Sequence, residues 1–150
     1  MTASDAAQTQ SGVPVPPPVP KVAELGTTSA PLKSAAFFIG AQCKDYNEDF
    51  MLCKDENRDP AHCLKEGRRV TRCATDVINK LRANCLQQFE AHWACLEQNN
   101  HENYRCRPAE HTFNACVFDK LGLKKTIPGT PEGRIPVHED KSPVLGRQQK

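Results

Sequence analysis

Cysteines are the residues of this chain whose type and spacing could do chemistry. The eight of them form four pairs with nine residues between partners: Cys43 and Cys53, Cys63 and Cys73, Cys85 and Cys95, Cys106 and Cys116. Cysteines in such a number bind a metal, exchange disulfides or staple a fold. Structural zinc sites generally take ligands a few residues apart, and thiol–disulfide catalysts present a close pair such as Cys-x-x-Cys. Because no two cysteines here are closer than ten residues, we expect no metal site and no redox catalysis, and predict structural disulfides.

The same spacing predicts helices. Ten residues of an α-helix turn by about 1000°, which leaves two cysteines within roughly 80° of each other on one face. Apolar residues between them recur at steps of three and four, as in Cys43, Tyr46, Phe50 and Cys53. These steps are typical of helices and not of strands. The cysteine-bearing middle of the chain is therefore expected to be all-α.

Helix ends can also be predicted. Asp59 followed by Pro60 is typical of an N-cap and a first helical turn, so one helix is expected to begin at Pro60. The polar run 99–103 predicts a turn between the third and fourth helices. Residues 74–84 contain no Gly or Pro, so the second helix is expected to continue before bending near Asn84.

Antiparallel hairpins make the disulfide pairing predictable, because the numbers of facing residues then add up to a constant. Of the 105 ways to pair eight cysteines, a nested scheme satisfies this rule in both hairpins: Cys43–Cys73 outside Cys53–Cys63, and Cys85–Cys116 outside Cys95–Cys106. The same rule places Phe50 near Gly67, where a missing side chain would make room for the ring. Each bridge would contribute on the order of 3 kcal/mol, which matters in a core region of only about 80 residues.

The ends of the chain have a different composition. Residues 11–20 hold five of the twelve prolines, and 121–150 hold four more. Proline fixes φ and lacks an amide donor, so these stretches are expected to be extended. The predicted division is a proline-rich extension, a short helical or docking segment, two hairpins and an extended C-terminal tail: 1–28, 29–42, 43–83, 84–121 and 122–150.

Charge and composition argue against several classes of protein. The net charge of +2 is too small to indicate a type of partner. The basic run 65–72 is interpreted as a solvated helix face in preference to a nucleic-acid site. No apolar run approaches the roughly 20 residues that span a bilayer. Residues 1–20 contain no Lys or Arg and no apolar core, so no secretory signal or matrix-targeting peptide is expected. A disulfide-rich chain without an export signal fits the mitochondrial intermembrane space.

The histidines are scattered and offer no catalytic motif: His62, His92, His101, His111 and His138. His92 lies on the predicted inter-helix face, where we expect a packed core histidine. Trp93 belongs to an apolar stripe of helical period with Leu86, Phe89 and Leu96. That stripe is either a docking surface or the contact between the two hairpins. No nucleophile elbow, phosphate loop or paired-carboxylate motif is present.

Four Cys-x9-Cys units in two hairpins resemble the doubled coiled-coil–helix–coiled-coil–helix (CHCH) family of mitochondria. The segments LKSAAFFIGAQC (32–43), FMLC (50–53), DPAHCLKEGRRVTRCA (59–74) and CVFDKLG (116–122) are similar to the 19-kDa accessory subunits of respiratory complex I, also called alpha subcomplex subunit 8. The resemblance covers about residues 29–122.

The resemblance implies a non-catalytic, imported subunit without flavin, iron–sulfur cluster, quinone or other cofactor. It would be oxidised by the intermembrane-space disulfide relay and lie peripherally on the inner membrane. Its partners would be other subunits of the membrane arm, and its role the assembly and stability of that arm. Residues 29–42 and both tails are expected to lie along neighbouring subunits. Two alternatives are an assembly factor for a respiratory complex and a redox enzyme of the relay.

Overall fold

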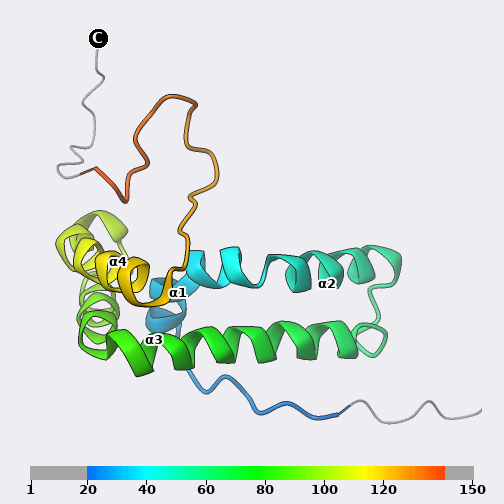
Figure 1. The fold of residues 1–150 in the computed structure, drawn as a ribbon. Coiled ribbons are helices and arrows are strands. Elements are labelled where there is room, and N and C mark those ends of the chain that lie inside the picture. The colour runs from blue at the N-terminus through cyan, green and yellow to red at the C-terminus, as the bar shows by residue number, and fades with distance from the viewer. Residues whose placement is uncertain (1–19, 141–150) are drawn as a thin grey trace, which may run out of the picture.

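The computed structural model describes residues 20–140, and every regular element within that range is a helix. In chain order these are α1 (Ser29–Gln42), α2 (Lys44–Glu56), α3 (Leu64–Gln98), the short 3₁₀ helix η1 (Asn103–Cys106) and α4 (Arg107–Leu121). In Figure 1, α2 lies beside the first half of α3 and α4 lies beside the second half. The predicted all-α fold of two disulfide-linked hairpins is confirmed. The predicted extended segments at 1–19 and 141–150 fall outside the described residues.

Helix α3 is shared by both hairpins. Residues 74–84 continue the helix without a break, and the backbone departs from helical geometry at Cys85, with φ −132° and ψ 37°. Backbone carbonyls at a helix break are open to side-chain donors. Lys120 Nζ donates to the carbonyl of Asn84, the residue just before the break, at 3.1 Å. The predicted bend near Asn84 is confirmed.

The loop between α2 and α3 differs from the sequence-based expectation. The Asp59 carboxylate accepts the amide of Ala61 at 3.1 Å, and the Asp59 amide donates to the Asn57 side chain at 2.9 Å. Both polar side chains therefore close local turns, as Asx residues commonly do. The predicted helix start at Pro60 is wrong, because these turns occupy the loop and α3 begins only at Leu64.

A polar turn separates α3 from η1, as the run 99–103 predicts. Asn100 and His101 both have positive φ, 52° and 60°, a left-handed conformation that asparagine and histidine tolerate better than most residues. The His101 carbonyl accepts a hydrogen bond from Lys33 Nζ at 2.5 Å, which ties the turn to α1. The short helix η1 that follows is not predicted by any local pattern.

The hydrophobic core lies where α1, the middle and second half of α3, and α4 meet. The Phe38 ring of α1 stands edge-on to Phe113 of α4, with centroids 5.5 Å apart, and Phe113 lies 5.4 Å from Phe89 of α3. The other buried members are Ala35, Cys43, Val77, Ile78, Leu81, Cys85 and Val117. Phe38 and Ala35 share one side of α1, which packs inside this chain's own core. The expected contacts of residues 29–42 with neighbouring subunits stay a prediction.

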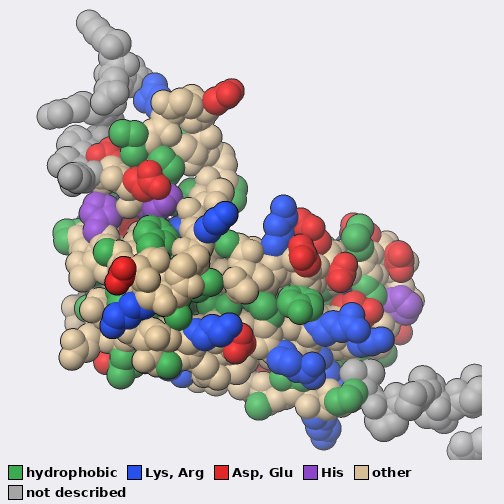
Figure 2. Space-filling model, in the orientation of Figure 1, with side chains coloured by type: hydrophobic (Ala, Val, Ile, Leu, Met, Phe, Trp, Pro, Cys, Tyr) green, Lys and Arg blue, Asp and Glu red, His purple; other side chains and the backbone are tan. Residues whose placement is uncertain are grey.

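The first hairpin has little core. Helix α2 buries none of its residues, and its Tyr46, Met51 and Leu52 are 45%, 58% and 62% exposed. Its ring contact with α3 is the predicted one: a Cβ placed on Gly67 would lie 3.3 Å from Phe50 Cε2. Figure 2 shows acidic side chains gathered on the α2 side of this hairpin and basic side chains on the α3 side.

Candidate functional site

Four disulfides join the elements of the two hairpins. Cα atoms of the bonded residues lie 5.9 or 6.0 Å apart, within the usual range for a bridge. The bonded pairs are Cys43–Cys73, Cys53–Cys63, Cys85–Cys116 and Cys95–Cys106. No cysteine is left free. The structure therefore brings together the eight residues that the sequence analysis selected, in two nested sets.

Every bridge has one of its cysteines on α3 or at its N-cap. Cys63 is the N-cap residue, and Cys73, Cys85 and Cys95 follow within the helix. The partners come from α1–α2 on one side and from η1–α4 on the other. Helix α3 is therefore the element to which both outer helices are covalently attached.

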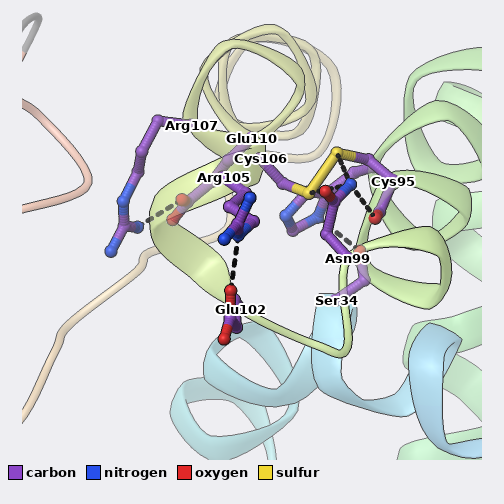
Figure 3. Close-up of a disulfide and its surroundings, with 9 residues drawn as sticks. Ser34, Cys95, Asn99, Glu102, Arg105, Cys106, Arg107 and Glu110 are labelled. Atoms are coloured by element: carbon purple, nitrogen blue, oxygen red, sulfur yellow. Dashed lines mark hydrogen bonds and ion pairs between the residues drawn. A yellow bond between two sulfur atoms is a disulfide. The ribbon is translucent and has the colours of Figure 1, made fainter.

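The Cys95–Cys106 bridge closes the turn at the end of α3 (Figure 3). Asn99 caps the helix there: its amide nitrogen donates to the Cys95 carbonyl at 2.8 Å and lies 3.5 Å from the Cys95 sulfur. An asparagine side chain that satisfies a terminal carbonyl stabilises a helix end. The bridge and the cap together fix where η1 leaves α3.

One group of side chains in the described residues has the composition of a metal site. The donor atoms of Cys53, His62 and Cys63 lie within 4.8 Å of one another at the hairpin tip. Metal coordination by cysteine requires the thiolate, and these two sulfurs are bonded to each other. The group is therefore a disulfide with a neighbouring exposed histidine.

A cluster of charged side chains is buried beneath α4. The Glu110 carboxylate pairs with Arg107 of the same helix and with Lys125 Nζ, the latter at 2.9 Å. Lys125 also donates to the Asn114 side chain at 3.1 Å. Glu110 and Lys125 side chains are only 4% and 2% exposed. Burial of single charges is unfavourable unless they are paired and hydrogen-bonded, and here each charge has such a partner.

Burial and ion pairing shift the pKa values of Glu110 and Lys125 in opposite directions. Burial by itself raises the pKa of Glu110, but Lys125 and Arg107 outweigh it and hold that pKa below its ordinary value. Burial lowers the pKa of Lys125, and attraction to Glu110 only partly offsets this effect.

Lys125 attaches the segment after α4 to α1. Its ammonium lies 5.5 Å from the ring centroid of Phe37 and 5.4 Å from that of Phe38, within range of a cation–π contact. Further along the same segment His138 is 4% exposed. Lys125 thus holds the segment after α4 against the helical core, just past the left-handed turn at Gly122 that ends α4.

His92 connects α3 to α1 inside the core. Its Nδ1 lies 2.7 Å from Ser34 Oγ, and its ring centroid lies 5.7 Å from that of Phe113. Burial lowers the pKa of His92 to about 4; the nearby Glu110 carboxylate acts to raise that pKa, and Lys125 and Arg107 act to lower it. A neutral, 3% exposed histidine hydrogen-bonded to a serine is the packed core residue that the sequence predicted.

The remaining histidines and the apolar stripe of α3 differ in how far they are buried. His62 is exposed, and His101 and His111 are half-buried. Of the apolar stripe, Phe89 and Leu96 are buried and Trp93 packs partly against the core, whereas Leu86 is 45% exposed. The stripe therefore serves mainly to pack α3 into the core.

The buried polar contacts of Glu110 with Lys125 and of Ser34 with His92 were not predicted from the sequence. Glu110, Lys125 and Ser34 stand among other polar residues and carry no motif. A three-residue step from Arg107 to Glu110 is a common helical ion pair, but it does not reveal burial. Nothing in the sequence signals that Lys125, four residues beyond the end of α4, returns to this carboxylate.

Two hairpins closed by four nested disulfides fit the CHCH class of proteins. No family model matches the chain. The NADH-ubiquinone oxidoreductase 20.8 kDa subunit of Neurospora crassa is 56% identical to it over 133 residues, an alignment that covers 87% of this chain and 73% of the relative. The chain belongs to the family of that subunit. Between residues 20 and 140, no helix combines the length and apolar character needed to cross a membrane.

Proposed function

We propose that this chain is a non-catalytic accessory subunit of mitochondrial NADH:ubiquinone oxidoreductase, complex I, of the type called the 19-kDa or alpha subcomplex subunit 8. The observation that carries the proposal is the 56% identity to a subunit named for that enzyme, extending over most of both chains. Its role is to support assembly and stability of the membrane arm, while electron transfer and proton pumping occur in other subunits.

The disulfide framework supports a bracing role. Four bridges on one shared helix restrict how α2 and α4 can move relative to α3. The buried charges near α4 are engaged with one another and attach the chain's own C-terminal segment. Such an arrangement stabilises a shape, and exposed apolar side chains of α2, including Met51 and Leu52, are available to partner subunits.

The proposed location is the intermembrane-space face of the inner membrane. Disulfides persist in oxidising compartments, so the relay that oxidises imported proteins there would form the four bridges. Peripheral attachment through neighbouring subunits would hold the chain at the membrane. We also propose that the two hairpins comprise residues 43–83 and 84–121, with the boundary at the bend in α3.

Native electrophoresis of mildly solubilised mitochondria tests the subunit assignment. The tagged chain should co-migrate with mature complex I at fixed stoichiometry, and its depletion should lower the amount of assembled complex. NADH oxidation per remaining assembled complex should stay unchanged, since the chain contributes no catalytic group. Detection of the chain only in subcomplexes or free would instead identify an assembly factor and overturn the assignment.

Peptide mapping of the isolated native protein tests the bridges. Non-reducing digestion should yield the four nested pairs, and alkylation before reduction should label no cysteine. A labelled, labile pair of thiols would favour the redox-enzyme alternative. A different connectivity would contradict the bracing role as described.

A further inference from the structure

An apolar groove of about 440 Å³ lies near the tip of the first hairpin. Its wall and floor include Phe50, Pro60, Leu64, Gly67 and Val70. The absence of a side chain at Gly67 exposes the Phe50 ring, whose Cε2 would be only 3.3 Å from a Cβ there. Leu64 remains 42% exposed. The groove thus combines an aromatic ring with aliphatic side chains on a hairpin that buries little else.

The described N-terminal segment begins beside this groove. Lys21, Val22 and Glu24 line a neighbouring hollow together with two residues of α3, and those two residues, Arg68 and Thr71, also line the groove. Figure 1 shows the segment running along α3 from the start of α1 toward the hairpin tip. Lys21, near the start of the described residues, therefore lies next to two residues that line the groove.

The two less exposed residues near the start of the described chain, Val22 and Leu25, are three positions apart, and the run 13–20 before them consists only of valine and proline. Leu25 packs against the core and Val22 is half-buried, while Ala23 and Glu24 between them are exposed. Continuing the same step toward the N-terminus gives Val19, Pro16 and Val13. A polyproline II helix has three residues per turn, so these residues would form one line on such a helix.

We propose that residues 13–19 bind in this groove as a polyproline II segment, with Val19 against Gly67 and Leu64. Proline-rich segments bind aromatic-lined apolar grooves in this way because their conformation costs little entropy to fix. The lengths agree for Val19: the three residues from Val22 to Val19 span about 9 Å in this helix, and the path along α3 to Leu64 from Thr71, which lines the hollow with Val22, rises by about 10 Å. The covalent connection at Pro20 gives this segment a high local concentration over any separate occupant.

Photo-cross-linking in the full-length oxidised chain tests the proposal. Leu64 is replaced by p-benzoylphenylalanine, and the dilute monomer is irradiated and digested with trypsin. The expected product joins the peptide containing position 64 to residues 1–21 of the same chain. Val19→Asp should lower its yield at least about tenfold, since a carboxylate in an apolar groove is strongly disfavoured.

Val15→Asp is the matched control, because Val15 is the same residue type in the same proline-rich run but lies off the three-residue line. It should leave the yield within about twofold of the parent, as surface substitutions usually have small effects. A second readout needs no cross-linker: the Gly67 amide NMR signal should shift in Val19→Asp and not in Val15→Asp. Cross-linked dimers as the main product, no product with residues 1–21, or equal effects of the two substitutions would each overturn the proposal.

Discussion

In the first hairpin no residue of α2 is buried, whereas α4, which lies against the second half of α3, buries Phe113, Val117 and two polar side chains. Both hairpins carry two nested disulfides with similar Cα separations. The difference arises from α1, whose Phe38 fills the space between α3 and α4 and has no counterpart along α2. The same covalent plan therefore stabilises one region that has a core and one that depends on its bridges.

The largest effect should follow from removing both bridges of the first hairpin. Replacing Cys43, Cys53, Cys63 and Cys73 with serine would remove about 6 kcal/mol of loop-closure stabilisation. Because α2 buries no residue, we expect it to lose its helical structure while the core around Phe113 persists. Hydrogen exchange should show loss of protection in 44–56 and retention in 107–121. Equal loss of protection in both segments would mean that the two regions are not distinct in stability.

A substitution in the hydrophobic core should destabilise the second hairpin more than the first. Phe113→Ala removes a ring that contacts Phe38, Phe89 and His92 and should lower the free energy of unfolding by about 3–5 kcal/mol. Tyr46→Ala in the first hairpin should cost less than about 1 kcal/mol, because that ring is 45% exposed. Urea denaturation of the oxidised proteins measures both values. Similar losses for the two variants would contradict the contrast.

The pH dependence should come from the buried histidine. The folded pKa of His92 is lowered from 6.5 to about 4, so between these values the unfolded chain binds a proton that the folded chain does not. Stability should be fully present above pH 6.5 and fall as the pH drops toward 4, by up to about 1.4 kcal/mol per pH unit.

Urea denaturation at a series of pH values measures that slope. His92→Asn should reduce it, whereas the exposed His62→Asn of the first hairpin should keep the parent slope. An unchanged slope in His92→Asn would show that other groups, such as the buried His138, account for the dependence.

The smallest expected effects are those of alanine substitutions at two glycines, one in α1 and one in the first hairpin. A Cβ added to Gly40 in α1 would meet no atom within 4 Å apart from its chain neighbours and the nearby backbone of its own helix, so Gly40→Ala should stabilise the helix by up to about 1 kcal/mol. At Gly67 the same gain is opposed by Phe50, 3.3 Å away, and Gly67→Ala should be neutral or destabilising. Thermal unfolding of the two single variants measures the difference. An equal gain at both positions would show that Phe50 moves aside at no cost.

Periodicity and cysteine spacing were enough to predict the two helical hairpins and the contact between Gly67 and Phe50, because these features depend on the repeat of residues along a helix. The bend near Asn84 was predicted from the lack of Gly and Pro in 74–84. The start of α3 was wrongly predicted because the Asp59 carboxylate has two local uses, a helix cap and a loop turn, and only the fold selects between them. The burial of Lys125 was not predictable, since it depends on a return of the chain that no local pattern encodes. The same holds for Ser34, whose partner His92 lies 58 residues away.

The placement of one half of every bridge on α3 has a consequence for oxidation. Successive cysteines of that helix are separated by about 15 Å or more of axial rise, well beyond the roughly 7 Å that a disulfide can span between Cα atoms. Once the helix has formed, its own thiols cannot join one another, which reduces the 105 conceivable pairings to roughly two dozen. Early formation of α3 would therefore lower the number of incorrectly paired disulfide isomers that can form during oxidation.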